Sequence, residues 1–181
     1  MDGWAGPWVV ASGVMEPTIR EATSDDLDEI NTIYNSYIVD SHTSFDTDPW
    51  TSTQRREWFA KYERGAGRYR VLVLEQAGQV VGFASSGPFR DKAAYDTSVE
   101  TTIVLGESAT GKGWGNELFA ALLDLLAFSG VHRAYALIAL PNEPSIRVHE
   151  RHGYVSIGTM NEVGHKLGAF HSVHLMERKF S

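Results

Sequence analysis

The chain has 181 residues, of which 43% are hydrophobic and 22% are charged, and its formal net charge is -7. This length suits one well-packed domain, and the ordinary composition excludes collagen, a coiled coil and global disorder for the chain as a whole. Cysteine is absent, which excludes disulfides, thiolate metal sites and a cysteine nucleophile. The acidic balance disfavours nucleic acids and anionic membranes as partners, and no apolar run approaches the roughly 18–20 residues that span a bilayer.

The N-terminal segment differs in character from the rest. Residues 1–17 carry Trp4 and Trp8 but no basic region of the kind that opens a signal peptide, so we expect no secretory signal and a cytoplasmic protein. We expect these residues to form an N-terminal arm, either disordered or packed on the surface. Residues 18–181 are expected to form the single domain.

The first half of that domain predicts one strand, two helices and a hairpin. Thr18–Ala22 is extended, and Thr23 or Ser24 can cap the helix that follows. The apolar face of that helix repeats at spacings of three and four, with Leu27, Ile30, Tyr34 and Tyr37. A polar loop over residues 40–49 leads to a second helix, which opens at residues 51–53 and continues to about residue 64. Residues 69–74 and 80–85 are rich in β-formers and flank a tight turn, which predicts a hairpin.

The second half alternates strands with helices. In a strand at Thr97–Leu105 the side chains alternate between two faces, with Val99, Thr101, Ile103 and Leu105 on one and Glu100, Thr102 and Val104 on the other. The next helix has a predicted buried stripe of Leu118, Leu122, Leu125 and Leu126. A strand at His132–Leu140, a short helix at Asn142–Arg151 and strands at Tyr154–Ile157 and Phe170–Lys179 complete the chain. This order predicts an α+β fold, with a mixed, mostly antiparallel central sheet flanked by helices.

A glycine-rich loop separates the strand at 97–105 from the helix after it. Its residues are Thr110, Gly111, Lys112, Gly113, Trp114 and Gly115. Glycines let the backbone approach a ligand closely, and the free N–H groups at the start of the helix suit an anion such as a pyrophosphate. The glycine spacing fits neither a Walker A loop nor a dinucleotide fingerprint. Taken alone, the loop could also be a simple flexible turn.

Together with other stretches, this loop makes the chain resemble the GNAT superfamily of acyl-coenzyme A dependent N-acyltransferases, and within it the phosphinothricin acetyltransferase group. The matching stretches are Tyr34–Ile38, Gly87–Phe89, Ala94–Glu100, Thr110–Gly115, Ile138–Ser145, His149–Tyr154 and Val163–Lys166. The resemblance extends from about Thr18 to Phe180. One departure is Thr110, which stands where the family has Gln or Arg.

The resemblance implies acetyl-CoA as the acyl donor, with its pyrophosphate on the glycine-rich loop. It also implies that the strands at 97–105 and 132–140 splay apart, so that the pantetheine arm lies along Ile103, Val104 and Leu105. Asn142 matches an asparagine that hydrogen-bonds this arm, and Ser145 lies in the same matching stretch. A plain helix N-cap is the alternative for Asn142.

Attack of an amine on a thioester requires the amine to lose its proton, so a base helps. The resemblance places the catalytic glutamate of the family at Glu100, for which a solvated strand carboxylate is the alternative. His149 stands where many members have a tyrosine and could protonate the departing thiolate, unless it is a structural residue of its helix. A backbone N–H near residues 103–105 could stabilise the oxyanion. Because no cysteine can carry an acyl group, we expect direct attack in a ternary complex.

Acceptor recognition points to two loops. By the resemblance, Phe45 closes over the acceptor. Arg90 and Lys92, which precede Tyr95, are candidate partners for an acceptor carboxylate, or else solvated cations. We therefore predict acetylation of the α-amino group of a small amino acid-like acceptor, of the phosphinothricin, methionine sulfoximine or methionine sulfone type.

Two alternatives stay open beside this enzyme. The chain could acetylate another amine, such as a protein N-terminus, or it could be a non-catalytic acyl-CoA sensor. The family implies a homodimer. The histidine pairs at residues 149 and 152 and at residues 171 and 174 have plausible ligand spacings, but the first does not form the zincin motif His-Glu-x-x-His, and the second lies on a predicted strand where residues three apart face opposite sides. We therefore expect no bound catalytic metal.

Overall fold

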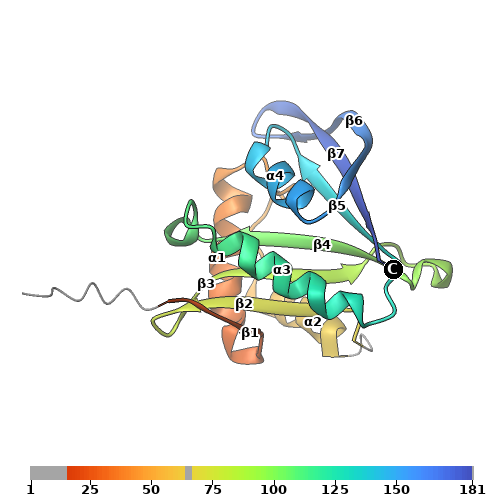
Figure 1. Ribbon diagram of the computed structural model, residues 1–181. Coiled ribbons are helices and arrows are strands. Elements are labelled where there is room, and N and C mark those ends of the chain that lie inside the picture. The colour runs from red at the N-terminus through yellow and green to blue at the C-terminus, as the bar shows by residue number, and fades with distance from the viewer. Residues whose placement is uncertain (1–15, 64–66, 181) are drawn as a thin grey trace, which may run out of the picture.

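The computed structural model describes residues 16–63 and 67–180, which form a seven-stranded sheet covered by helices on both faces (Figure 1). The strands are β1 Thr18–Glu21, β2 Arg70–Gln76, β3 Gln79–Pro88, β4 Ser98–Leu105, β5 Arg133–Ala139, β6 Val155–Lys166 and β7 Ala169–Lys179. The helices are α1 Leu27–Asp40, α2 Ser52–Glu63, α3 Trp114–Ala127 and α4 Glu143–Arg151. The strand order is β1-β2-β3-β4-β5-β7-β6, and only β4 and β5 run parallel. The expected mixed, mostly antiparallel sheet is confirmed.

One face of the sheet is covered by α3 and α4. Leu118, Leu122 and Leu126 of α3 are fully buried at a spacing of four, as their pattern predicts. Leu125 is 37% exposed, so its predicted place in the buried stripe is wrong. Phe119 and Leu123, at 0% and 1% exposed, widen the stripe on its other side instead. The buried surface of α3 is therefore rotated away from residue 125.

The other face is covered by α1 and α2. Leu27 and Ile30 of α1 pack against Val71, Val73 and Phe83 of the sheet in a second apolar cluster. Trp58, Phe59 and Tyr62 of α2 lie at the border of this cluster. The first helix begins through a 3₁₀ turn at Ser24–Asp26, in which the Asp26 carboxylate accepts a hydrogen bond from the Thr23 N–H at 2.7 Å.

Strand β4 confirms the predicted alternation of its side chains. Val99 is buried in the cluster under α3, and Ile103 and Leu105 pack against the same cluster. Val104 packs against the cluster under α1 and α2, and Glu100 and Thr102 face a cavity beside α2. Strand β4 therefore presents Val99, Ile103 and Leu105 to the face that α3 covers, and Glu100, Thr102 and Val104 to the face that α1 and α2 cover.

The C-terminal hairpin is longer than expected. The strand predicted at Tyr154–Ile157 is wrong in its extent, because β6 runs from Val155 to Lys166. The later part of β6 contains glycines and polar residues, which do not predict a strand. Two register shifts against β7 also interrupt the alternation of its side chains. The turn at Leu167 and Gly168 has positive φ at both positions, 51° and 76°, as two-residue hairpins require.

Most of the expected N-terminal arm, residues 1–17, lies outside the described residues. Within residues 16–63 and 67–180, no helix is long and apolar enough to cross a bilayer.

Candidate active site

The two parallel strands at the centre of the sheet pair over three residues only. The register runs from Ser98 opposite Arg133 to Glu100 opposite Tyr135. Beyond this point β4 continues beside β3 as far as Leu105, while β5 continues beside β7 (Figure 1). We call the divergence between residues 101–105 of β4 and 136–139 of β5 the wedge. The expected splay of these strands is thereby confirmed.

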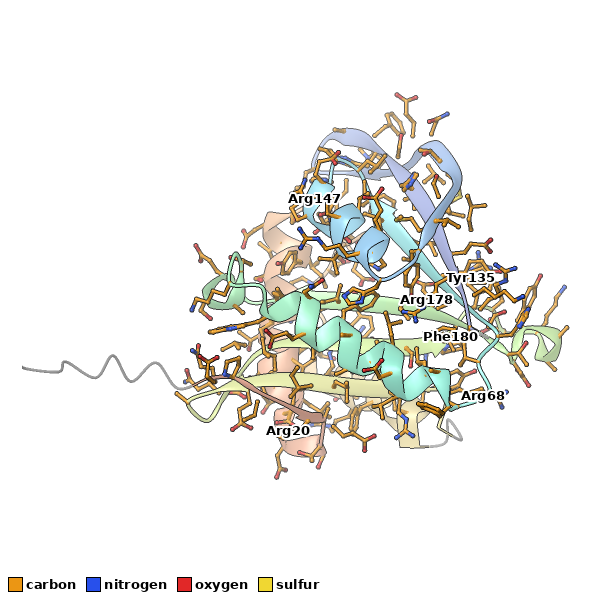
Figure 2. The ribbon with its side chains drawn as sticks, viewed as in Figure 1. Arg20, Arg68, Tyr135, Arg147, Arg178 and Phe180 are labelled. Carbon is orange, nitrogen blue, oxygen red and sulfur yellow. The ribbon has the colours of Figure 1, made fainter. Side chains whose placement is uncertain are left out.

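Side chains fix the point where the strands diverge. The Thr101 hydroxyl donates to the Tyr135 carbonyl at 3.2 Å and shares a 2.7 Å hydrogen bond with the Tyr154 hydroxyl. Arg178 donates to the His152 carbonyl at 3.0 Å, and its guanidinium lies 4.8 Å from the centre of the Phe180 ring (Figure 2). The Thr101 hydroxyl therefore fixes the point of divergence in addition to backbone pairing, and Arg178 joins the neighbouring strand β7 to the end of α4.

The free edge of β4 presents backbone groups to the wedge. The Gly106 N–H donates to Val81 of β3 at 2.8 Å, so the backbone of Leu105 faces the opposite side, where the Tyr37 hydroxyl donates to its carbonyl at 2.8 Å. Because backbone groups alternate along a strand, the N–H groups of Ile103 and Leu105 both point into the wedge. The Val104 carbonyl points to β3, where it lies near Gly82. Of the three predicted residues, Ile103 and Leu105 can therefore offer backbone donors there.

The glycine-rich loop lies next to the end of β4. Gly111 and Gly113 have φ of 74° and 86°, a conformation that other residues rarely adopt, and Gly113 caps the start of α3. A Cβ on Gly115 would lie 2.8 Å from Leu105 Cδ1, so this glycine allows α3 to begin against β4. The N–H groups of Trp114 and Gly115, the first two residues of α3, precede the hydrogen-bond ladder of the helix and lie beside the end of β4.

Two side chains of this loop have other contacts. Lys112 Nζ lies 4.3 Å from the centre of the Trp114 ring. The Thr110 hydroxyl donates to the Glu107 carbonyl at 2.8 Å, within the preceding turn. Lys112 is exposed, so its charge is available to an anion, whereas the Thr110 hydroxyl supports the turn itself.

The start of α4 is built from Asn142 and Ser145. The Asn142 side chain accepts a hydrogen bond from the Ser145 N–H at 3.2 Å, so it is the N-cap of the helix. The Ser145 carbonyl in turn accepts a hydrogen bond from Nδ1 of His149 at 2.8 Å. Two hydrogen bonds along α4 therefore connect Asn142, Ser145 and His149 in sequence.

His149 is buried among aromatic rings. It is 2% exposed, and its ring lies edge-on to Phe119 and Tyr154 at centroid distances of 4.8 and 5.0 Å. Burial lowers the pKa of His149 from its ordinary 6.5 to about 4, against the opposing effect of the Ser145 carbonyl. The ring is therefore neutral near pH 7, with its proton on Nδ1, and its buried Nε2 has no hydrogen-bond partner among the described residues. This state does not favour His149 as the proton donor that the sequence suggests.

Glu100 lines a cavity of about 240 Å³ between α2 and the sheet. The cavity walls are Trp58, Lys61, Tyr62, Tyr69, Ser85, Gly87, Pro88, Glu100 and Thr102. Burial raises the pKa of Glu100 above its ordinary value, and the positive charge of Arg90 opposes this effect. The carboxylate is thus a stronger base than a solvated one, and it lies at the last residue where β4 pairs with β5.

Phe45 lies apart from the other candidate acceptor residues. It is 39% exposed and packs over Gly164 of β6, where a Cβ would overlap its ring. The neighbouring Ser44 carbonyl accepts a hydrogen bond from the buried Lys166 ammonium at 2.6 Å. The polar loop after α1 is thereby attached to the β6–β7 hairpin.

Arg90, Lys92 and Tyr95 are exposed on the connection between β3 and β4. Arg90 and Tyr95 gather around Phe89, at 4.4 and 5.9 Å from its ring centre, and Phe89 stacks on Tyr135 at 4.2 Å. Since Tyr135 is the last residue of β5 that pairs with β4, these residues lie at the paired end of the wedge. The structure thus separates them from Phe45 instead of joining all four in one cluster.

Sequence reasoning missed the α2 side of the cavity. Trp58, Lys61 and Tyr62 are wall residues that no motif singles out, and the helix that carries them shows little separation of apolar and polar faces. Within the described ranges, no three His, Asp or Glu side chains come together as they would around a metal ion.

Comparison with known proteins agrees with this geometry. Residues 30–154 match the acetyltransferase (GNAT) family. The chain belongs to this family. It is 42% identical to a phosphinothricin N-acetyltransferase of Streptomyces coelicolor, over 92% of this chain and 98% of that protein. It is 32% identical to an L-methionine sulfoximine/L-methionine sulfone acetyltransferase of Pseudomonas aeruginosa, over 90% and 94% of the two chains.

The fold of this GNAT acetyltransferase is shared with solved structures. One is an acetyltransferase of Salmonella typhimurium determined with its cofactor acetyl-CoA, with a TM-score of 0.88 and 29% identity over 92% of this chain and 95% of that one. The diverging strands and the glycine-rich loop thus belong to a fold in which a relative carries acetyl-CoA.

The buried His149 leads to a pH-dependent stability. Its pKa is lower in the folded chain than in the unfolded chain, so the unfolded chain gains a proton first as the pH falls. Between pH 7 and pH 4 this should remove roughly 3 kcal/mol of unfolding free energy. In urea unfolding at a series of pH values, the unfolding free energy of His149→Gln should decline by about that much less than that of the unchanged chain. An unchanged decline in His149→Gln would mean that the folded ring takes up a proton readily.

Proposed function

We propose that this acetyltransferase moves the acetyl group of acetyl-CoA to the α-amino group of a small amino acid-like acceptor, of the phosphinothricin, methionine sulfoximine or methionine sulfone type. The proposal rests chiefly on Glu100, a half-buried carboxylate of raised pKa that lines a cavity at the point where β4 and β5 diverge. The similarity to the Streptomyces and Pseudomonas enzymes supports the class of acceptor.

The residues of this chain fit acetyl-CoA. The left-handed glycines at positions 111 and 113 have open space where a side chain would be, and the N–H groups of the first turn of α3 lie beside them. Lys112 adds a cation for a phosphate. The free edge of β4 and the unpartnered Nε2 of His149 are polar groups that a pantetheine arm could pair with. When bound, the thioester supplies the acetyl carbon for attack and a thiolate that can leave.

The chain supplies the base and the oxyanion donors. In this proposal the Glu100 carboxylate takes the proton of the acceptor ammonium, directly or through a water, and its raised pKa improves the match to an amine. The N–H groups of Ile103 or Leu105 donate to the oxygen that becomes negative during attack. Because the chain has no cysteine, no thiol carries the acetyl group in between.

His149 gives no proton to the departing thiolate. As the C–N bond forms and the C–S bond breaks, the second proton of the attacking nitrogen passes to the sulfur or to water. The His149 ring is neutral near pH 7 and has its Nδ1 proton on the Ser145 carbonyl. We therefore assign His149 the role of a hydrogen-bond acceptor. Its unprotonated Nε2 accepts from a donor of the bound pantetheine arm, and the ring does not act as an acid.

The cavity suits a small, acidic acceptor. Its volume of about 240 Å³ is close to the lower end of ligand pockets. Lys61 lies in its wall, and Arg90 is close enough to influence the charge of Glu100. We assign Arg90, Lys92 and Tyr95 to the outer contacts at the paired end of the wedge, and Phe45 to the loop on the opposite flank.

We also propose a homodimer formed through the C-terminal hairpin. Its two strands and their turn expose a set of large apolar side chains, namely Val155, Ile157, Met160, Val163, Leu167 and Phe170. Light scattering after gel filtration should give a mass near twice 20.0 kDa, and a monomer mass would refute this part of the proposal.

An acceptor screen tests the proposed reaction. Purified protein, acetyl-CoA and a thiol reagent are combined with phosphinothricin, methionine sulfoximine, methionine sulfone, the common amino acids and a peptide with a free N-terminus. We expect thiol release with at least one of the first three compounds. Release with the peptide alone would replace the acceptor class, and no release with any amine while acetyl-CoA still binds would refute catalysis.

Glu100→Gln tests the base. The amide cannot accept the proton, so turnover near pH 7 should fall by about 10²–10⁴-fold, while the affinity for acetyl-CoA stays near that of the original protein. Glu57→Gln, an exposed carboxylate on α2, is the matched control and should keep full turnover. If Glu100→Gln and Glu57→Gln turn over alike, Glu100 is not the base.

A further inference from the structure

Arg55 of α2 is a buried cation without a carboxylate partner. Its residue is 1% exposed, and none of the ion pairs among the described residues includes it. Its Nε donates to the Asn31 side chain at 3.1 Å, and one terminal nitrogen is buried with no hydrogen-bond partner in the described part of the chain. Burial of such a cation costs free energy, so packing alone gives no reason for an arginine here.

Three aromatic rings surround the guanidinium. Its central carbon lies 4.7 Å from the ring centre of Tyr34, 4.4 Å from that of Trp50 and 4.7 Å from that of Trp58. These rings come from α1, from the loop before α2 and from α2 itself. The face of each ring attracts the desolvated cation, so Arg55 ties three separate segments to one centre.

The Tyr34 ring connects Arg55 to the loop that carries Phe45. The Tyr34 hydroxyl donates to the Asp46 carboxylate at 2.6 Å. The Trp50 backbone is fixed on both sides, since its carbonyl accepts from Asn31 at 2.8 Å and its N–H donates to Asn35 at 2.9 Å. The loop over residues 45–50 is therefore held at its end by the same residues that surround Arg55.

The Trp58 ring connects Arg55 to the cavity that Glu100 lines. Trp58 is part of the wall, and its ring lies edge-on to that of Tyr62, a second wall residue, at 4.7 Å. Trp58 is thus in contact with the guanidinium on one side and with the cavity lining on the other. Arg55 itself does not line the cavity, so any effect on the acceptor must pass through these rings.

We propose that Arg55 is a positioning residue for the acceptor, which holds the Trp58 wall of the cavity and the loop at residues 45–50 in one fixed arrangement. This proposal rests on the proposed function, because it assigns the cavity beside Glu100 to the acceptor. A flat, charged group with a directional Nε–H can hold three rings and Asn31 at once, which an apolar side chain cannot do. Arg55 therefore acts on the acceptor and leaves the acetyl-CoA side of the wedge unaffected.

The test compares Arg55→Met, Arg55→Lys and a control, Arg56→Met, which removes an exposed arginine from the same helix. Each is measured for the KM of phosphinothricin, the KM of acetyl-CoA and the thermal midpoint. Met removes the ring contacts and the desolvation cost of the charge together, so the thermal midpoint of Arg55→Met should change little, whereas its KM for phosphinothricin should rise about tenfold or more. The KM for acetyl-CoA should stay within about twofold, and Lys should restore part of the phosphinothricin affinity because it keeps the cation.

Several results would overturn this role. An unchanged KM for phosphinothricin in Arg55→Met would do so, and so would a joint change of both KM values with a lowered midpoint, which indicates a purely structural residue. If Arg55→Met does not fold, Arg55→Lys decides by the same comparison. If the unmodified protein fails to acetylate phosphinothricin, the acceptor identified in the screen takes its place. Failure of the unmodified protein with every acceptor refutes the proposed function and the acceptor role of Arg55 with it, whereas a failure that appears only in the comparison of variants refutes the role of Arg55 alone.

Discussion

The limited pairing of β4 with β5 is the constraint on which the rest of the site depends. Parallel strands normally pair along their length, but here the ladder ends after Glu100 and Tyr135. At the next residue the Thr101 hydroxyl donates to the Tyr135 carbonyl, so this carbonyl has a hydrogen-bond partner where the ladder ends. Beyond it, the backbone of Ile103 and Leu105 remains available to a ligand.

The same divergence explains where the titratable groups lie. Glu100 is on the α2 face of β4 at the last paired residue, and His149 is on the α4 side under Phe119 and Tyr154. Burial acts on both groups but in opposite directions, because it disfavours the charged form of each. The result is a carboxylate that is a better base and an imidazole that stays neutral. The first assists an acyl transfer to an amine, whereas the neutral imidazole has no proton on Nε2 to give to a departing thiolate.

Much of the fold could be predicted from the sequence. The spacing of Leu27, Ile30 and Tyr34 predicts α1, and the alternation along residues 97–105 predicts which side chains of β4 face each helical layer. The full length of β6 could not be predicted. The strand continues across glycines because its backbone bonds to β7, and its side chains form no pattern that predicts a strand. The splay of the central strands came from the family resemblance, since pairing between distant segments leaves no local pattern.

The site could be predicted only in part, for a similar reason. Glu100 and the glycine-rich loop lie in recognisable motifs, whereas Lys61, Tyr62 and Arg55 belong to a helix whose polar and apolar residues are mixed. Their importance depends on the cavity and on the rings around Arg55, which form only when α1, α2 and β4 come together. Conversely, Phe45 and Arg90 are both near the site but on different flanks, a distinction that sequence order does not reveal.

In the proposed function the free edge of β4 and the start of α3 together receive acetyl-CoA. Amide hydrogen exchange by NMR, with and without acetyl-CoA, tests this residue by residue. We expect slower exchange of the N–H groups of Ile103, Leu105 and Gly115 on binding, with little change along β1 at the far edge of the sheet. Binding of acetyl-CoA that leaves the exchange of Ile103 and Leu105 unchanged would show that the free edge of β4 does not receive it.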